Sequence, residues 1–365
     1  MKLFNLLRQY TTLEDVPRLA NKQGVAGLLY HDVIESEENP SDSRWLMRLS
    51  GYVQNRQKRY HLHKEEMEKL ARFYDRYGIG MVVLKGYGLS LNWPTSDFRQ
   101  PGDLDIFLFD KRQRTEDSRN HIWQYADRLV EEKLGIQVDD SHEHHTCFSL
   151  GDLGVENHYD IIDTKTHKDG KLVDCKLKDL VLEHVKTAIP VLDNVYLPSA
   201  DFNAIFLMRH MGQDFGSTHT SLRQICDWGF FIEKHSAEVD WEMVIPFLKE
   251  MGIIKFFHII NAICVDYLGF DEKAFPEIVH NTTLEKRILD DLFNPEFSEV
   301  QPKGKVIQNI IFKTRRYWKN SWKKEFIFKY SPFVDFFYGV RMHLGRWKTL
   351  GECVLFSLGG MLAIE

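Results

Sequence analysis

The spacing of hydrophobic and polar residues divides the chain into stretches with different periodicity. Over residues 1–77 the apolar positions recur at helical spacing, and residues 44–77 are dense in Arg, Lys and Glu. This pattern predicts an N-terminal helical region at 1–77. It contains one long, largely solvated helix, for which Asp42 is the expected N-cap.

The pattern changes at Gly78, where short and continuous apolar runs replace the helical spacing. Such runs are typical of buried strands, which we expect at 80–84, 103–109, 136–138, 144–150 and 155–162. Asp110 is expected to begin a helix of roughly twenty residues. Several strands with only one or two helices predict an α+β domain with a mixed sheet at 78–195, rather than a doubly wound one.

Beyond Pro198 the pattern returns to helical spacing, at 203–210, 221–233, 241–251 and 254–267. This predicts a helical domain at 196–300, followed by a basic, aromatic helical region at 301–365. The apolar run at 354–364 is far shorter than the ~20 residues that a membrane span needs. We therefore expect no transmembrane segment, and we interpret this run as a buried C-terminal helix or hairpin.

Charge is distributed unevenly around a net value of −6. The segment 302–348 holds twelve Lys or Arg and two Asp or Glu, so the remainder of the chain is acidic. This leaves nucleic acid open as a partner, but a solvated basic face on C-terminal helices is the favoured interpretation.

The cysteines and histidines bear on whether the chain contains a zinc site or disulfide bonds. The five cysteines are widely spaced and include no CxxC pair, which argues against a zinc ribbon and a disulfide framework. Residues 1–10 lack the apolar core of a signal peptide, so we expect a cytoplasmic protein. The run His142-Glu143-His144-His145 contains residue types that bind zinc. Without a partner set elsewhere, a solvated strand entry is the favoured interpretation.

Asp103 and Asp105 are the first candidates for catalytic chemistry. Residues two apart on a strand project from the same face, so the two carboxylates are expected to converge. Adjacent acids repel each other unless a cation lies between them. Mg²⁺ suits this arrangement because it binds a few carboxylates and keeps room for phosphate oxygens. The pair therefore predicts a Mg²⁺ site, with Mn²⁺ as an alternative.

Two further groups of residues extend this prediction. Lys85-Gly86 ends the first strand, where a glycine lets the backbone approach a phosphate and Lys85 adds positive charge. On the later strand, Glu156, His158 and Asp160 are expected to share one face. A two-metal displacement needs a third carboxylate, for which Glu156 is the first choice and Asp160 the second. His158 is interpreted either as a phosphate-positioning or acid–base group or as a hydrogen-bonded structural histidine.

Arg223 and Asp227 lie four residues apart in a predicted helix, and they leave two interpretations open. They could pair with each other along the helix, or Arg223 could point into the cleft toward a phosphate.

These motifs occur in a recognisable order: Leu84-Lys85-Gly86, then Arg99 ahead of Asp103-Leu104-Asp105, then Glu156-Asn157-His158. The order resembles the uncharacterised nucleotidyltransferase family of the polymerase-β superfamily, which has an LKG turn, an Arg before a D-hydrophobic-D strand and a later acid-x-His. The resemblance extends to His210, to Arg223-x-x-x-Asp227 and to Asp240-Trp241. It covers residues 28–267.

The resemblance implies a minimal polymerase-β-like nucleotidyltransferase mixed sheet, flanked by N-terminal helices and a C-terminal helical domain. It also implies a Mg²⁺-dependent enzyme that transfers a nucleoside monophosphate from a nucleoside triphosphate to an acceptor hydroxyl and releases pyrophosphate. The acceptor is unknown: a small molecule, a glycan, a peptide or a protein. By this resemblance the metal-binding catalytic residues are Asp103, Asp105 and Glu156, and the nucleotide-binding residues are Lys85, Gly86, Arg99, His158 and Arg223.

The sequence departs from the superfamily at one turn, and it leaves two other functions open. Lys85-Gly86 stands where the superfamily carries a Gly-Ser turn, so a hydroxyl expected near the phosphates is missing. The chain could instead be a non-catalytic nucleotide-binding or scaffold module of a biosynthetic complex. It could also be a glycosyltransferase that uses DxD to hold a cation, a class that predicts a longer alternation of strands and helices before Asp103.

Overall fold

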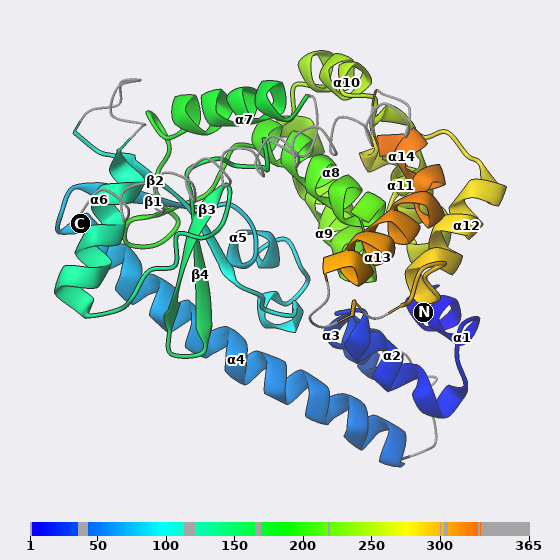
Figure 1. Cartoon of the computed structure of the whole chain (residues 1–365). Helices are drawn as coiled ribbons and strands as arrows, with labels where there is room; N and C mark the ends of the chain where they lie inside the picture. Colours follow the sequence, from blue (N-terminus) through cyan, green and yellow to red (C-terminus); the bar gives the residue numbers. More distant parts are fainter. Residues whose placement is uncertain are drawn as a thin grey trace, which may run out of the picture.

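A computed structural model describes residues 2–35, 43–112, 121–164, 169–217, 220–299, 301–302, 306–327 and 329. One mixed sheet lies at its centre, with the strand order β3-β4-β2-β1-β5 (Figure 1). The strands are β1 (Ile79–Val83), β2 (Leu104–Asp110), β3 (His145–Leu150), β4 (Leu153–His158) and β5 (Val195–Tyr196). Strand β2 pairs antiparallel with β1 and parallel with β4, while β3 pairs antiparallel with β4. The predicted α+β class with a mixed sheet is confirmed.

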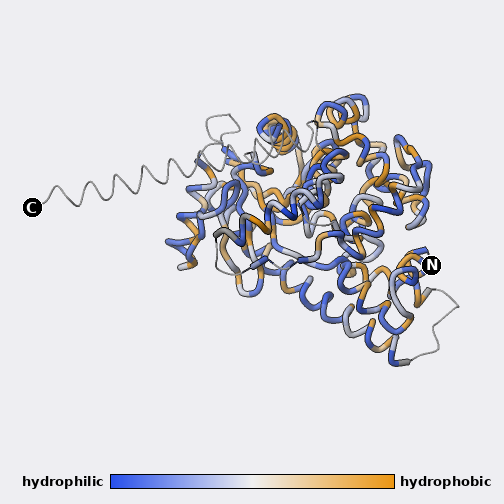
Figure 2. The backbone as a smooth tube through the Cα atoms, turned by 45° about the vertical axis from the view of Figure 1, so that its right-hand side comes forward, coloured by the Kyte–Doolittle hydropathy of each residue, from blue (hydrophilic) through white to orange (hydrophobic). Residues whose placement is uncertain are grey.

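Alternation along the strands assigns the side chains to two different cores. Leu104, Ile106 and Leu108 of β2 face a cluster that includes Met67 and Tyr74 of the long helix α4 (Ser43–Asp75). Helix α6 (Ile122–Leu129) packs on the same face. Figure 1 shows α4 running diagonally beneath the sheet. Figure 2 shows that α4 is mostly hydrophilic, with hydrophobic residues at intervals, as expected for a helix that buries one stripe.

The opposite face of the sheet contributes to a larger core. Phe107 and Phe109 of β2 belong to it, together with helix α7 (Gly170–His184) and the helices that follow β5. The N-terminal helices also contribute to this core and therefore pack with the helices that follow β5. The N-terminal helices are α1 (Lys2–Arg8), α2 (Val16–Lys22) and α3 (Ala26–Glu35). Asp105 lies on this face of β2, because it alternates with Leu104 and Ile106.

Helices dominate the chain after β5. They are α8 (Ala200–Ser217), α9 (Leu222–His235), α10 (Trp241–Glu250), α11 (Ile254–Ile263), α12 (Thr282–Phe293), α13 (Val306–Lys319) and α14 (Ser321–Ile327). Ser221 begins α9 with a capping box, in which its hydroxyl accepts the amide of Gln224. The order of elements agrees with the sequence pattern, and their bounds differ from the predicted ones by a few residues.

Several sequence predictions are wrong in detail. No strand forms at 136–138. The next residue, Asp139, makes an isolated bridge with Cys147. Asp110 ends β2 instead of starting a helix, because its backbone pairs with Ile79. Strand β4 ends at His158, so Asp160 lies beyond it. The predicted cap Asp42, residues 113–120 of the predicted helix and the apolar run at 354–364 lie outside the described residues.

The order and the lengths of the elements bear on the glycosyltransferase alternative and on the expected absence of a membrane span. In the described part of the chain only β1 precedes β2, after four helices, which is not the strand–helix alternation that a glycosyltransferase predicts. Among the described helices no single one has the length and apolar character to cross a membrane. The pair Trp241–Glu250 and Ile254–Leu268 meets both criteria only when combined, and it is bent by 118°.

Candidate active site

Strand pairing brings the candidate residues together at one end of the sheet. Asp105 of β2 lies opposite Glu156 of β4 in the parallel register, and Phe107 lies opposite His158. The amide of Leu84 donates to the carbonyl of Asp105 at 3.0 Å, which extends the β1–β2 pairing by one residue and sets Lys85 beside Asp105. Residues distant in the sequence are therefore neighbours through backbone hydrogen bonds.

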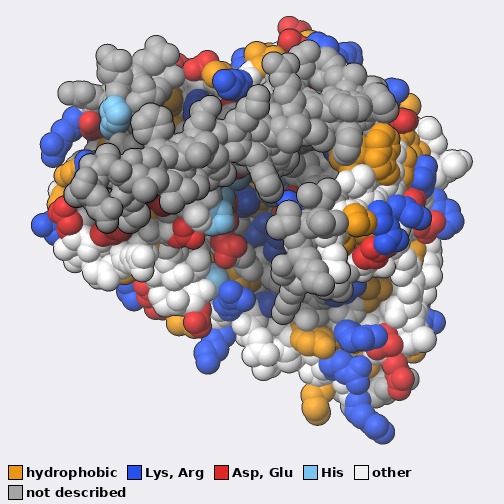
Figure 3. Space-filling view, in the orientation of Figure 1, with side chains coloured by type: hydrophobic (Ala, Val, Ile, Leu, Met, Phe, Trp, Pro, Cys, Tyr) orange, Lys and Arg blue, Asp and Glu red, His pale blue; other side chains and the backbone are white. Residues whose placement is uncertain are grey.

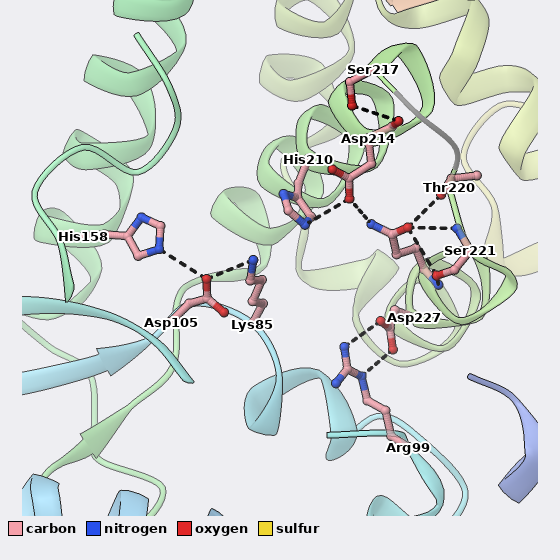
Figure 4. A network of polar contacts seen from close by, with 11 residues as sticks. Lys85, Arg99, Asp105, His158, His210, Asp214, Ser217, Thr220, Ser221 and Asp227 are labelled. Carbon is pink, nitrogen blue, oxygen red and sulfur yellow. Dashed lines mark hydrogen bonds and ion pairs between the residues drawn. The ribbon is translucent and has the colours of Figure 1, made fainter. Parts of the chain in front are cut away.

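Asp105 is the centre of this group. Its Oδ1 lies 2.9 Å from Nζ of Lys85 and 3.2 Å from Nε2 of His158 (Figure 4). His158 Nε2 also lies 3.5 Å from Oε2 of Glu156. The Asp105 side chain is 1% exposed, and within the described part of the structure its Oδ2 is buried without a hydrogen-bond partner. One oxygen of the carboxylate is thus neutralised, and the other is buried without a hydrogen-bond partner in the described structure.

The charges of these residues depend on one another. Burial alone would raise the pKa of Asp105, but the charge of Lys85 and the hydrogen bond from His158 outweigh it and hold that pKa below its usual value. Burial likewise opposes the charged form of Lys85, and Asp105 reverses the effect, so the pKa of Lys85 is raised. Asp105 is therefore a carboxylate, as a cation ligand must be.

His158 is held between acceptors on both sides of its ring. Nδ1 lies 3.2 Å from the carbonyl oxygen of Asp160, and Nε2 faces Asp105 and Glu156. Burial lowers the pKa of His158, but the hydrogen bonds to Asp105 and Glu156 overcome this and raise it. The positive charge that the two carboxylates attract is supplied either by this proton or by a bound cation.

A divalent cation fits this group of residues. Asp105, Glu156 and His158 each place a ligand atom within 4.8 Å of the others. The buried, unpartnered Oδ2 of Asp105 supplies the free lone pairs that such an ion needs. The structure thus brings Asp105 and Glu156, two of the predicted metal ligands, to one place, and their role as ligands stays a prediction.

Asp103 does not converge with Asp105 as the sequence predicted. It is exposed and lies outside the group formed by Asp105, Glu156 and His158, since β2 begins only at Leu104. Its carboxylate lies against Gly154, where an added Cβ would come within 2.8 Å of Oδ1. Asp103 and Asp105 do line the same cavity. The two carboxylates thus share a cavity without converging on one point in the structure.

That cavity has a volume of about 220 Å³ and lies between the sheet and helices α8 and α9. Lys85, Gly86 and the two aspartates line it on the sheet side. The helical wall consists mainly of polar residues: His210, Asp214, Arg223 and Gln224. Figure 3 shows histidine and acidic side chains side by side near the centre of this face.

Arg99, which the sequence predicts to bind the nucleotide, forms an ion pair with Asp227. Its Nε and Nη2 donate to Oδ1 and Oδ2 of Asp227 at 2.7 and 2.8 Å, and both side chains are buried. The indole of Trp93 donates to the same Oδ1 at 2.8 Å. Asp227 therefore does not pair along its helix with Arg223. It joins the loop before β2 to α9 through a bidentate ion pair.

Arg223 lines the cavity and has hydrogen-bonding capacity left. Its Nη1 donates to the carbonyl of Gln100 at 3.2 Å, while Nε is buried with no partner among the described residues. Burial, followed by the charge of Arg99, lowers the pKa of Arg223. Burial and the charge of Arg223 also lower the pKa of Arg56 on α4 to about 10. Three guanidinium groups thus gather here, with Asp227 as the carboxylate bound to Arg99.

Gly86 and Asp160 complete the predicted set. Gly86 adopts φ of 68°, a conformation that favours glycine, and it precedes helix α5 (Tyr87–Ser90). Because α5 has four residues, it offers the amides of a single turn and only a small dipole. Asp160 turns away from the group and pairs with Lys178 of α7, which also lies 2.7 Å from Asp174. The structure therefore brings Glu156, and not Asp160, to Asp105.

Sequence reasoning missed part of the helical wall. Asp214 lies 3.6 Å from His210, and its Oδ2 accepts the amide group of Gln224 at 2.7 Å (Figure 4). Burial, followed by the charge of Lys85, lowers the pKa of His210 to about 4. The i, i+4 spacing of His210 and Asp214 was the available signal, but it cannot show which face of α8 meets the sheet.

Comparison with known proteins identifies one family. The family described as "Uncharacterised nucleotidyltransferase" matches residues 11–269, well over half of the chain. This range contains the sheet, the Lys85–Asp105 pair and the helical wall of the cavity. Neither a curated protein nor a solved structure matches the chain. The family match confirms the resemblance read from the sequence, and the chain belongs to the uncharacterised nucleotidyltransferase family.

Proposed function

We propose that the protein is a Mg²⁺-dependent nucleotidyltransferase that binds the phosphates of a nucleoside triphosphate in the cavity between the sheet and α8–α9. It transfers the nucleoside monophosphate to an acceptor hydroxyl and releases pyrophosphate. The observation that carries the proposal is the group Asp105, Glu156 and His158, with an unpartnered carboxylate oxygen buried beside Lys85.

The charge distribution supports an anionic ligand that arrives with a cation. Asp105 and Glu156 would hold Mg²⁺, or Mn²⁺ in its place, and Asp103 would reach the same ion or a second one from the rim of the cavity. When bound, the cation neutralises charge on the phosphates and lowers the pKa of the attacking hydroxyl. Lys85 keeps Asp105 ionised in the empty site.

The helical wall supports binding of the phosphates. Arg223 Nε faces no partner among the described residues, and an unpaired buried guanidinium nitrogen is costly, so a phosphate oxygen would satisfy it. Arg99 supports the wall from behind through Asp227. A volume of about 220 Å³ lies below the ~300–1,000 Å³ of sites that enclose a whole drug-sized ligand. The cavity thus fits the triphosphate, and the nucleoside would extend out of it.

Equilibrium binding of non-hydrolysable analogues of the four common nucleoside triphosphates, with and without Mg²⁺, tests the proposal without knowledge of the acceptor. We expect Mg²⁺-dependent binding of at least one analogue. Glu156→Gln and Asp105→Asn should each weaken it by at least about tenfold, because each removes a charged ligand of the cation. Asp160→Asn is the matched control, since this nearby acid pairs with Lys178, and it should bind like the wild type.

Pyrophosphate release under the same conditions separates catalysis from binding. Turnover that disappears in Asp105→Asn supports the transferase. Metal-dependent binding with no pyrophosphate release in the presence of candidate acceptors would favour the nucleotide-binding scaffold instead. If no analogue binds with either Mg²⁺ or Mn²⁺, the proposed donor site is wrong.

A further inference from the structure

A second group of metal-binding side chains lies at the edge of the sheet, outside the cavity. His142, His145 and Cys147 each place a ligand atom within 4.8 Å of the others. His145 and Cys147 belong to the edge strand β3, and His142 belongs to the loop that precedes it. None of the three lines the cavity that holds Lys85 and Asp105.

Backbone pairing explains how this group forms. His145 and Cys147 are two apart on β3, so their side chains project from the same face of the sheet. The backbone of Asp139 pairs with Cys147 through two hydrogen bonds of 2.8 and 2.9 Å, which folds the loop back over the strand. The hydroxyl of Tyr159 donates to the carbonyl of His142 at 3.0 Å and fixes the loop at that point.

One polar atom of these three side chains is buried and unsatisfied. His145 is 7% exposed, and its Nδ1 is buried with no hydrogen-bond partner among the described residues. Its ring stacks on that of His142, with centroids 4.7 Å apart and planes at 23°. Cys147 is a free thiol of intermediate exposure. A buried imidazole nitrogen without a partner beside a thiol and a second imidazole is a costly arrangement that a bound cation would relieve.

We propose that His142, His145 and Cys147 bind a thiophilic divalent cation of the Zn²⁺ class, at a site that shares no residue with the Asp105–Glu156–His158 group but lies beside it, since His145 pairs with His158 and Cys147 with Glu156 across the sheet. Two imidazoles and one thiolate select such a cation over Mg²⁺, which prefers oxygen ligands. Three protein ligands leave one tetrahedral position for water or an incoming ligand.

The geometry needs only a small adjustment. Ligand atoms at the usual Zn–N and Zn–S distances lie roughly 3.4–3.6 Å apart in a tetrahedral site. Because the ligand atoms lie within 4.8 Å of one another, any two of them need to approach by at most about 1.4 Å, and rotation of the exposed His142 side chain can shorten its distances to the other two. The same exposure gives the ion a path from solvent.

Asp139 is placed to orient His142. Its Oδ2 lies 3.8 Å from Nε2 of His142, while Oδ1 accepts the amide of Ser141 at 2.9 Å. In metal sites, the second nitrogen of a histidine ligand commonly donates to a carboxylate in this way.

Burial, followed by the charge of Glu156, raises the pKa of Cys147 to about 11. The thiol of the metal-free protein therefore gives up one proton to solvent when the cation binds.

Titration of the chelator-treated, metal-free protein with Co²⁺ tests the proposal, because Co²⁺ bound to a thiolate gives a charge-transfer absorption in the near ultraviolet. We expect that absorption to appear in the wild type, to disappear on addition of Zn²⁺ and to persist in excess Mg²⁺. Zn²⁺ should also raise the unfolding temperature of the wild type, since an ion that binds only the native state stabilises it.

Cys147→Ser removes the thiolate and should abolish the absorption, and His142→Gln, at an exposed position, should weaken Co²⁺ binding by at least about tenfold. Cys175→Ser changes an exposed cysteine on α7 and should leave both readouts unchanged. Asp105→Asn should also retain the absorption, which separates this site from the proposed nucleotide site. An unchanged absorption in folded Cys147→Ser, or no absorption in the wild type, would overturn the proposal.

Discussion

Lys85 Nζ lies 2.9 Å from Asp105 Oδ1, and this contact links the turn after β1 to the interior of β2. Asp105 is almost completely buried, while the Lys85 side chain is 29% exposed at the cavity wall. The pair holds a carboxylate in its ionised form inside the protein and leaves its second oxygen free. The site therefore contains a buried, ionised carboxylate with one oxygen that has no partner among the described residues.

Asp105→Asn should lower the free energy of unfolding by about 1.5–3 kcal/mol, the range for a lost hydrogen bond to a charged group, because Lys85 and His158 lose their carboxylate. The double variant Asp105→Asn/Lys85→Met should recover most of this loss, since no lysine charge is then left without its partner. Urea unfolding measures both effects. A single variant as stable as the wild type would contradict the coupling between the two residues.

Asp227→Ala should destabilise the protein by about 3–5 kcal/mol, because it leaves the buried guanidinium of Arg99 without its carboxylate. The matched control is Asp15→Ala, which removes the carboxylate from an exposed pair with Arg18 and should cost less than about 1 kcal/mol. The two midpoints in urea should differ accordingly. Similar midpoints would mean that the Arg99–Asp227 pair adds little to the packing between the loop and α9.

Gly154→Ala tests whether Asp103 takes part in ligand binding. The new Cβ would lie 2.8 Å from Oδ1 of Asp103, and the end of that exposed side chain can move aside, so the fold should remain intact. We expect Mg²⁺-dependent nucleotide affinity to fall by about tenfold or more, since displacement of a positioning group by about 1 Å is costly.

Gly51→Ala is the control for this variant. Gly51 lies on α4 and does not line the cavity, and a Cβ there meets no atom within 4 Å. The control should bind nucleotide like the wild type. Wild-type affinity in Gly154→Ala as well would exclude a ligand role for Asp103 and leave the site to Asp105 and Glu156.

His210 gives a pH dependence with a defined sign. Its pKa in the folded protein is about 4, whereas an unfolded histidine titrates near pH ~6.5. Between these values the unfolded chain binds a proton that the native protein does not, so this histidine makes stability fall as the pH falls through that window. Lys85, which opposes the imidazolium, and Asp214, which favours it, are the nearest charges.

His210→Gln removes this contribution and should lose less stability than the wild type when the pH is lowered through the same window. Urea unfolding at several pH values measures the difference. His144 and His145, whose pKa values burial also lowers to about 4, contribute equally to both proteins and cancel in the comparison. Identical pH profiles for the two proteins would show that His210 titrates normally in the folded state.

The continuous apolar runs and the helical spacing of apolar residues were sufficient to predict the mixed sheet and the surrounding helices, and the order of the motifs was sufficient to recognise the family. Local signals are strong where apolar residues are buried continuously along a strand, as in β2, or where the sequence carries a capping box, as at Ser221 and Gln224. The prediction failed at 136–138, because a single bridge from Asp139 to Cys147 satisfies the backbone without forming a strand. Such a choice depends on the partner strand and not on the local sequence.

The sequence by itself determined which residue types carry the chemistry: the acids on β2 and β4, the lysine after β1 and the arginines near β2 and on α9. Only the tertiary structure decided their partners. Arg99 pairs with Asp227, Glu156 rather than Asp160 lies beside Asp105, and Cys147 lies beside His142 and His145. The physical reason is that strand register and helix docking fix distances between residues far apart in the chain, and periodicity carries no information about either.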